Sequence, residues 1–403
     1  MDARPAVLFL AHRIPWPPNK GDKVRSFNIL RHLAQRYRVY LGTFVDHPDD
    51  LAHVDRLSEW CADVHVERLH PLPARLASLR GLLSGEALSL PYYRNATLQR
   101  WVRDTLANRA IERAVVFSGP MAQYLDAAAL QRVVVDFCDV DSAKWTQYAA
   151  SRSGPLAWLY RREGRRLLAF EAAAAQRADA ALFVTAAEAQ LFRTAAPQAA
   201  ARVGVMQNGV DAAYFSPAHD FTRPWPEGGP VLAFTGAMDY WPNIDAVCWF
   251  AAEVLPALRA RHPGIRLAIV GMNPAPAVRA LAAEDVLVTG SVPDVRPYLA
   301  HAEVVVAPLR VARGIQNKVL EAMAMARAVV VSADSATGLA GQAGEAYVSA
   351  LSAVDFTAAV SALLHAPERA RAIGSAARRT VERCYSWDAH LGRLDELLEG
   401  ASC

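Results

Sequence analysis

A group of basic residues, a glycine and a carboxylate in the second half of the chain has the spacing of an anion-binding site. Lys318 and Glu321 are three residues apart, so on a helix they share one face. They follow a turn that contains Arg310, Arg313 and Gly314. The glycine lets the backbone approach a ligand, and the unpaired N–H groups of a helix start attract anions. A cation for phosphate and a carboxylate for hydroxyl groups predict a nucleotide-sugar site, whereas an ordinary helix with one solvated Lys–Glu pair explains the same spacing.

A second candidate site follows the apolar run at residues 132–136. Asp139 and Asp141 come just after this predicted strand, and Lys144 lies close behind them. Side chains at the carboxyl end of a parallel strand point into the crevice where α/β proteins bind ligands. The alternative is that the Asp-Ser pair only caps the helix predicted from about residue 142.

A third candidate is the loop that follows the first predicted strand, residues 6–11. It leads through Gly21, Asp22, Lys23 and Arg25 into a helix predicted at residues 24–37. Strand, glycine-containing loop and helix form the opening of a nucleotide-binding α/β unit. The chain has no G-x-G-x-x-G here, so a dinucleotide site is not supported. Alternatively, Gly21 is a turn residue and Asp22 a helix N-cap.

Alternating strands and helices must position these residues, and the same alternation occurs in both halves of the chain. In the first half we expect further strands at 39–45, 64–69, 115–119 and 180–185, with helices at 51–61 and 142–177. In the second half we expect strands at 231–236, 266–271, 286–290, 303–308 and 328–332, helices from 243, at 276–283 and at 295–302, and a helical tail at 352–398. A Pro- and Gly-rich linker at 217–230 separates the halves. This pattern predicts an α/β fold with two doubly wound domains, 1–218 and 219–383.

The amino-acid composition excludes several classes of protein. The 403 residues carry a net charge of +3, which gives no footprint for nucleic acid, and 53% are hydrophobic, which excludes general disorder. The five cysteines lack metal-ligand spacing and fit a reduced, cytosolic setting. No apolar segment approaches the ~20 residues needed to span a bilayer. The stretches 71–93 and 158–168 are amphipathic, so each either packs on the sheet or touches anionic lipid.

The run from Gly314 to Ala324, Gly-Ile-Gln-Asn-Lys-Val-Leu-Glu-Ala-Met-Ala, resembles the donor-site signature of family 4 retaining glycosyltransferases, which have the GT-B fold. The resemblance implies that the helix start and Lys318 bind the donor diphosphate and that Glu321 binds the ribose. Gly236 would let the phosphate approach the first strand of the second domain. Many family members carry a second Glu where this chain has Arg313.

Two departures from the family pattern concern the donor. The basic residues that often follow the glycine at position 236 are replaced by Ala-Met-Asp-Tyr-Trp. Lys318 would therefore meet the phosphate charge with help from Arg310 or Arg313. Arg313 cannot accept hydrogen bonds from a sugar, since guanidinium only donates. It either binds the diphosphate or reads an acidic group on the donor sugar, and both interpretations remain open.

The resemblance also assigns residues of the first domain. In related transferases the first loop touches the acceptor and the donor phosphate, which makes Gly21, Asp22, Lys23 and Arg25 candidates, with Lys144 nearby. A polar residue at the strand end, Asp139 or Asp141, would lie near the transferred sugar and act in catalysis together with Lys318. Because GT-B enzymes generally hold the diphosphate without a divalent ion, we expect no metal and no other cofactor. Tyr385-Ser-Trp387 resembles the point where GT-B chains cross back, so residues 384–403 form a returning helix.

The N-terminal run Pro-Trp-Pro-Pro-Asn-Lys-Gly-Asp-Lys-Val-Arg-Ser at 15–26 resembles the sugar transferases of exopolysaccharide clusters associated with PEP-CTERM and exosortase. This implies a cytoplasmic hexosyltransferase, with peripheral contact to the inner membrane face as an option. It would move a sugar, with retention, from a nucleotide donor (UDP favoured) to a lipid-linked or oligosaccharide acceptor. A GT-B nucleotide-sugar epimerase and a non-catalytic nucleotide-sugar-binding scaffold are the alternatives.

Overall fold

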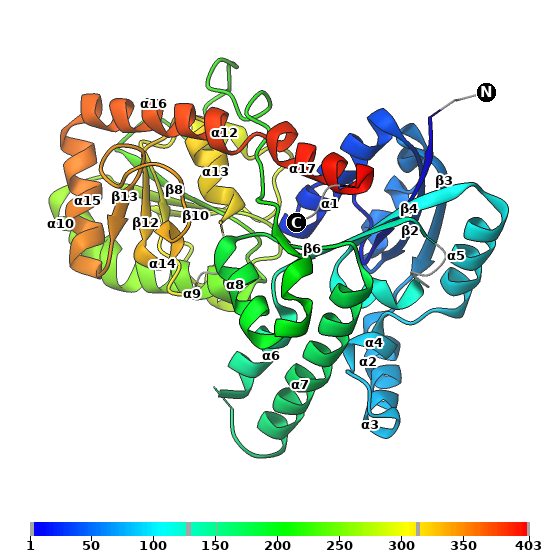
Figure 1. Cartoon of the computed structure of the whole chain (residues 1–403). Helices are drawn as coiled ribbons and strands as arrows, with labels where there is room; N and C mark the ends of the chain where they lie inside the picture. Colours follow the sequence, from blue (N-terminus) through cyan, green and yellow to red (C-terminus); the bar gives the residue numbers. More distant parts are fainter. Residues whose placement is uncertain (1–3, 126–129, 151, 312–314, 401–403) are drawn as a thin grey trace. The chain divides into compact units, whose positions relative to one another are not determined.

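The computed structural model describes residues 4–125, 130–150, 152–311 and 315–400. The chain forms two compact units (Figure 1): unit 1 comprises Met1–Gln207 and His390–Cys403, and unit 2 comprises Asn208–Ala389. The last helix, α17 (Trp387–Glu399), therefore begins in unit 2 and ends in unit 1. The division lies before the Pro- and Gly-rich linker, because residues 208–217 pack with unit 2. The backbone N–H of Val210 donates to Tyr385 O at 2.9 Å, and Arg378 Nη1 donates to Phe215 O at 3.1 Å.

Unit 1 is organised around a seven-stranded parallel sheet in the order β3-β2-β1-β4-β5-β6-β7. Its strands are β1 (Ala6–Ala11), β2 (Arg38–Val45), β3 (Cys61–Arg68), β4 (Ile111–Phe117), β5 (Arg132–Cys138), β6 (Ala180–Phe183) and β7 (Val203–Val205). Every residue of the inner strand β1 is buried, as expected for a parallel strand covered on both faces.

Helices connect these strands and cover the sheet (Figure 1). The α-helices are α1 (Gly21–Arg36), α2 (Pro71–Ser78), α3 (Arg80–Ser84), α4 (Ser89–Tyr92), α5 (Ala96–Asn108), α6 (Asp141–Ala150), α7 (Gly154–Arg177) and α8 (Ala186–Ala195). Short 3₁₀ segments are η1 (Pro48–His53), η2 (Asp55–Glu59), η3 (Gly119–Tyr124) and η5 (Pro197–Arg202).

Several elements of unit 1 differ from the sequence prediction. The helix predicted at 142–177 is two helices, because Gly154 has φ +66° and the following Pro155 disfavours a helical residue before it. The helical stretch predicted at 51–61 consists of η1 and η2. Helix α5 was not predicted, although Asn95 caps it by accepting hydrogen bonds from Thr97 N and Leu98 N.

Unit 2 contains a six-stranded parallel sheet in the order β10-β9-β8-β11-β12-β13. Its strands are β8 (Val231–Thr235), β9 (Arg266–Val270), β10 (Val286–Val288), β11 (Val304–Ala307), β12 (Val329–Ser332) and β13 (Val348–Ala350). Its helices are α9 (Trp241–Trp249), the π-helical η6 (Phe250–Val254), α10 (Leu255–Arg261), α11 (Pro276–Arg279), α12 (Arg296–Ala300), α13 (Asn317–Ala324), α14 (Ala333–Ala336), α15 (Ala353–His365) and α16 (Pro367–Cys384).

In both sheets successive strands are first added on one side of the unit's first strand and then on its other side. In unit 1 the strand order thus reverses between β1 and β4, and in unit 2 between β8 and β11. Open parallel sheets bind ligands at the carboxyl ends of the strands at such points. The topology confirms the predicted pair of doubly wound α/β domains. No helix in the described part of the chain has the length and apolar character needed to cross a membrane.

Candidate functional site

The carboxyl ends of β8 and β11 bring Lys318 together with Gly236 and Asn243, although Lys318 is 75 residues from Asn243 in the sequence. Gly236 follows β8, and Lys318 lies in the first turn of α13, the helix that follows β11. Lys318 Nζ donates a hydrogen bond to Asn243 Oδ1, and it stands 4.4 Å from the centre of the Phe234 ring. Asn243 Nδ2 in turn donates to Ala237 O at 2.8 Å, which fixes the orientation of the amide. The lysine is therefore held in place over the end of β8.

Glycine is the only residue type that fits at position 236. Its φ is +152°, a conformation that L side chains rarely adopt. A Cβ at this position would lie 2.8 Å from Asn243 Nδ2 and 2.9 Å from Lys318 Nζ. The absence of a side chain leaves both the backbone and the lysine open to close approach by a ligand.

Lys318 and Glu321 lie in surroundings that disfavour charge. Burial lowers the pKa of Lys318 to about 7, although the nearby Glu321 carboxylate acts to raise it. Burial likewise raises the pKa of Glu321 to about 7, against the opposite effect of Lys318. Among the described residues, none donates a hydrogen bond to the Glu321 carboxylate. An anion beside Lys318 and hydroxyl groups beside Glu321 would satisfy both side chains.

The other predicted donor-binding residues differ in their position. Arg310 forms a two-pronged ion pair with Asp245 of α9, in which Nε donates to Oδ2 at 2.9 Å and Nη2 to Oδ1. Its side chain remains half exposed, but Asp245 already balances its charge. Arg313 and Gly314 lie outside the described residues. Lys318 is thus the predicted residue that the structure places beside Gly236, and Glu321 lies near Lys318 on the same helix.

Asn243 was not among the predicted site residues. It is buried near the start of α9, and its partner Lys318 is 75 residues away in the sequence. A signal for it exists in the sequence: Asn243 belongs to the first helix after the first strand of unit 2. Helix starts at such positions carry ligand-binding groups.

In unit 1, the predicted catalytic carboxylates share one lysine. Lys144 Nζ donates to Asp139 Oδ2 and to Asp141 Oδ1, each at 2.9 Å. Burial acts to lower the pKa of Lys144, but Asp141 and Asp139 together hold it well above its ordinary value. All three side chains are partly exposed, so the group is accessible at the start of α6. Among the residues that the structure describes, no group of three or more His, Cys, Asp or Glu could hold a metal ion.

Glu171 lies behind this group and was not predicted as a site residue. Its carboxylate accepts hydrogen bonds from Ser142 N at 3.2 Å and from Ser142 Oγ at 2.5 Å. Burial, followed by repulsion from Asp141, raises the pKa of Glu171 to about 8. The side chain therefore anchors the start of α6 through both hydrogen bonds, in surroundings that favour its protonated form.

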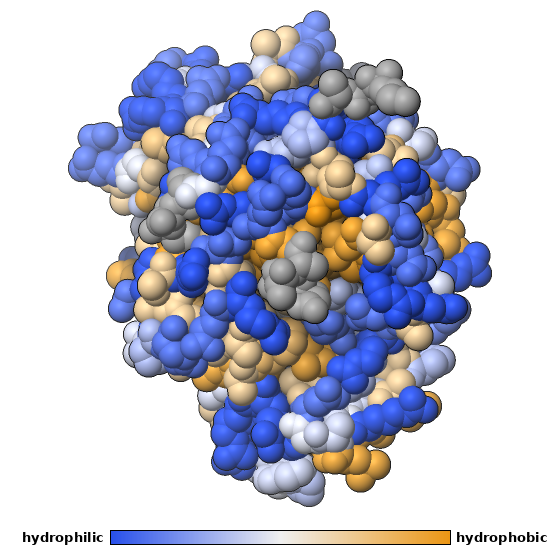
Figure 2. Space-filling view, turned by 45° about the vertical axis from the view of Figure 1, so that its right-hand side comes forward, coloured by the Kyte–Doolittle hydropathy of each residue, from blue (hydrophilic) through white to orange (hydrophobic). Residues whose placement is uncertain are grey.

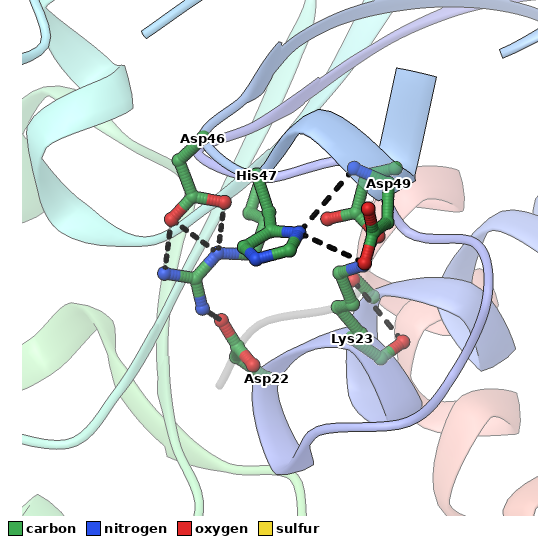
Figure 3. A network of polar contacts seen from close by, with 8 residues as sticks. Asp22, Lys23, Asp46, His47 and Asp49 are labelled. Atoms are coloured by element: carbon green, nitrogen blue, oxygen red, sulfur yellow. Dashed lines mark hydrogen bonds and ion pairs between the residues drawn. The ribbon is translucent and has the colours of Figure 1, made fainter. Parts of the chain in front are cut away.

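The first loop of unit 1 forms a network of ion pairs (Figure 3). Asp22 and Asp46 lie on opposite sides of the guanidinium of Arg13, with Arg13 Nη2 2.7 Å from Asp46 Oδ2. His12 Nε2 is 3.4 Å from Asp22. Burial acts to raise the pKa of Asp22, but His12 and Arg13 hold it well below its usual range. Sequence reasoning missed His12 and Arg13, although both directly follow β1 at the point where the strand order reverses.

Two predictions about this loop are corrected. Helix α1 begins at Gly21 after Lys20, so Asp22 is a first-turn residue and not the N-cap. Gly21 itself is exposed at the helix start. Lys23 was expected to face a ligand, but it is buried and its Nζ donates to Asp50 Oδ1 at 2.7 Å.

Arg25 is corrected in the same way. Its guanidinium is buried and donates to both carboxylate oxygens of Asp136, Nε to Oδ2 at 2.7 Å and Nη2 to Oδ1 at 3.1 Å. Nη2 also donates to Met206 O at 2.7 Å. Because the guanidinium is buried and held by Asp136 and Met206, Arg25 joins α1 to β5 and does not face a ligand.

Comparison with known proteins extends this description. Residues 229–366 match the family model described as glycosyl transferases group 1, and the matched region lies within unit 2. Sequence comparison with curated proteins yields no match.

Solved structures resemble the whole chain. Sucrose-phosphate synthase from Thermosynechococcus elongatus has a TM-score of 0.74 at 18% identity, with 98% of each chain covered. HepE from Anabaena, solved with UDP and glucose, has a TM-score of 0.68 at 15% identity, covering 99% of this chain and 100% of its own. WaaG, a glycosyltransferase involved in lipopolysaccharide biosynthesis, has a TM-score of 0.67 at 16% identity, with 98% and 100% covered. The chain has the GT-B fold, as predicted, and the match of residues 229–366 to the group 1 model supports a glycosyltransferase.

Proposed function

We propose that this protein transfers a sugar from a nucleotide-sugar donor, with UDP as the favoured nucleotide, to a lipid-linked or oligosaccharide acceptor. The observation that carries the proposal is the cage of Gly236, Asn243 and Lys318 at the strand-order reversal of unit 2, beside Glu321. This cage lies in the region that matches the group 1 glycosyltransferase model. It combines a close backbone approach, a helix start and a cation, which are the features that hold a diphosphate.

The roles of the residues in unit 2 follow from their chemistry. Lys318 and the N–H groups at the start of α13 would stabilise the negative charge that develops on the departing diphosphate, the largest charge change in sugar transfer. The Glu321 carboxylate accepts no hydrogen bond from the residues that the structure describes, so it would accept hydrogen bonds from ribose hydroxyls. Support for UDP comes from HepE, which was solved with UDP and with UDP-glucose.

Finer aspects of the proposal rest on the sequence resemblance. We assign the protein to the retaining family 4 enzymes and to hexosyl transfer in exopolysaccharide synthesis of the PEP-CTERM type, at the cytoplasmic side of the membrane. Asp139 and Asp141 would lie near the transferred sugar, with Lys144 holding both carboxylates in position. Asp22 and Gly21 remain candidates for the acceptor side. Arg313 would bind either the diphosphate or an acidic donor sugar.

A screen of nucleotide sugars tests the proposal. A ligand present at 100 times its Kd should add roughly 2.7 kcal/mol to the free energy of unfolding, so a thermal-shift panel identifies the donor. Release of UDP from that donor only in the presence of an acceptor supports a transferase. Release together with epimerised sugar and no acceptor would favour the epimerase, and binding without any turnover would favour the scaffold.

We expect turnover to be independent of divalent metal ions. Asp139 and Asp141, the D-x-D pair that could suggest a metal site, are both bound to Lys144 Nζ at 2.9 Å. The ammonium group occupies the position that a cation would need. Full activity in excess EDTA is the expected result. Loss of activity that Mg²⁺ or Mn²⁺ restores would contradict it.

A further inference from the structure

An apolar surface on unit 1 has no partner within the described chain. Five leucines on and between α2 and α3 are exposed, and we call them the leucine patch: Leu72, Leu76, Leu79, Leu82 and Leu83. Leu83 is 93% exposed, Leu72 72% and Leu76 71%. Leu156 and Trp158, near the start of α7, are exposed as well, Trp158 by 55%. Contiguous exposed apolar groups of this kind mark an interaction site.

The leucine patch is rigidly attached to α7. Arg162 of α7 is buried, and its Nη2 donates to Gly81 O in α3 at 2.6 Å. The neighbouring Glu163 is also buried and accepts hydrogen bonds from Leu88 N at 2.6 Å and Ser89 N at 2.9 Å. Trp158 lies four residues before Arg162, so both share one face of α7. The leucine patch and Trp158 thus belong to one end of unit 1, where α2, α3 and α7 lie side by side in Figure 1.

The charged side chains within the leucine patch are all basic, and the nearby carboxylate of Glu86 is paired with Arg94 at 3.1 Å. No Asp or Glu occurs at residues 70–85 or 142–162. Arg75 and Arg80 are exposed on α2 and α3, and Arg161 and Arg165 are exposed on α7. In the space-filling view, hydrophobic groups are exposed at the lower edge of the molecule next to hydrophilic ones (Figure 2). This surface combines aliphatic side chains with arginines that form no ion pair with any carboxylate in the described part of the chain.

We propose that the leucine patch, with the start of α7, docks onto an anionic lipid bilayer. The leucines would enter the acyl boundary, Trp158 would lie at the headgroup level, and Arg75, Arg80, Arg161 and Arg165 would contact lipid phosphates. Helices α2 and α3 have 8 and 5 residues, so they can lie in the interface and cannot span it. A protein partner would need an acidic group placed opposite each of these arginines. A bilayer with anionic headgroups presents negative charge everywhere on its surface, so it needs no such specific arrangement. The inference is independent of the donor site in unit 2.

Vesicle co-sedimentation of the full chain tests this proposal. The probe vesicles contain equal parts of phosphatidylglycerol and phosphatidylcholine, and the reference vesicles contain phosphatidylcholine alone. We expect the protein to bind the anionic vesicles and to dissociate as salt is raised. The Leu76→Asp/Leu83→Asp variant should lose about tenfold in partition coefficient for each leucine. Leu351→Asp is the matched control, because Leu351 is 84% exposed in unit 2 and lies outside the patch.

A second pair of variants tests the charge. Arg75→Gln and Arg80→Gln should each weaken partition about fivefold, since an arginine near an anionic surface contributes about a factor of this size. Arg103→Gln, on the exposed face of α5, should have no effect. Unchanged melting temperature and UDP affinity would show that each variant is folded.

Three results would overturn the proposal. The wild-type protein could fail to bind anionic vesicles, or the leucine variant could bind them as well as the Leu351→Asp control does. Alternatively, size-exclusion chromatography could show a concentration-dependent dimer that the leucine variant abolishes, without vesicle binding. That last result would assign the leucine patch to a second copy of the chain.

Discussion

Replacing Lys318 with alanine is expected to weaken UDP binding by roughly tenfold to a hundredfold, because it removes the proposed charge-assisted hydrogen bond to phosphate, worth about 1.5–3 kcal/mol. The fold should tolerate the change, since burial already lowers the pKa of this amine and so disfavours its charged form. Titration calorimetry with UDP and steady-state turnover measure the two effects. Arg371→Ala, at an exposed position on α16, is the matched control. Unchanged turnover of Lys318→Ala at both limiting and saturating donor would contradict the proposed site.

The pH dependence of binding provides an independent check on Lys318. Its folded-state pKa is about 7, below the ordinary 10.5, so the free protein loses this charge as the pH rises through 7. A bound diphosphate favours the charged form and raises this pKa. We therefore expect UDP affinity to fall by up to tenfold per pH unit above about pH 7. In Lys318→Ala this slope should become shallower, and at this site only the ionisation of Glu321, whose pKa burial raises to about 7, should still contribute to it.

The lowered pKa of Lys318 affects the free energy of unfolding in the opposite direction to its effect on UDP affinity. Between about pH 7 and the ordinary pKa of lysine, the unfolded chain binds more protons than the folded one. The contribution of Lys318 to the free energy of unfolding therefore rises with pH in this window. Binding and stability should thus change in opposite directions between pH 7 and 9.

Replacing Arg25 with methionine is expected to destabilise unit 1 by about 3–5 kcal/mol, the usual cost of removing one partner of a buried ion pair. Asp136 is 0% exposed and would be left with a charge and no guanidinium. Urea denaturation followed by fluorescence measures the loss. Arg103→Met, which breaks an exposed ion pair with Asp104, should change stability by less than about 1 kcal/mol.

A double variant separates this structural role from ligand binding. Arg25→Met/Asp136→Leu removes both charges and should recover much of the lost stability, since apolar replacements of buried pairs are often neutral or better. Equal stability of Arg25→Met and the Arg103→Met control, together with a loss of turnover, would instead restore Arg25 as a ligand-contacting residue.

The sequence by itself determined the features that depend on local spacing. Apolar runs identified the strands of both sheets except β7 and β13, and their alternation with helices led to two doubly wound domains. Lys318 and Glu321 could be placed on one face of a helix because a separation of three residues defines a helical face. The close placement of Asp139, Asp141 and Lys144 has the same origin, since all three lie within one turn of the start of α6. Local prediction was wrong where a proline and a positive-φ glycine divide the helix after Ala150.

Only the tertiary structure decided which charged residues are available to a ligand. Arg25 and Lys23 occur in a loop-and-helix sequence that suits phosphate binding, yet Asp136 and Asp50 occupy them from 111 and 27 residues away. Lys318 keeps its place through Asn243, 75 residues earlier, and Arg310 is paired with Asp245 across 65 residues. Such partners meet only when parallel strands from distant parts of the chain align their carboxyl ends. The type and spacing of a charged residue therefore show what it can bind, whereas long-range pairing and burial decide whether it is free to do so.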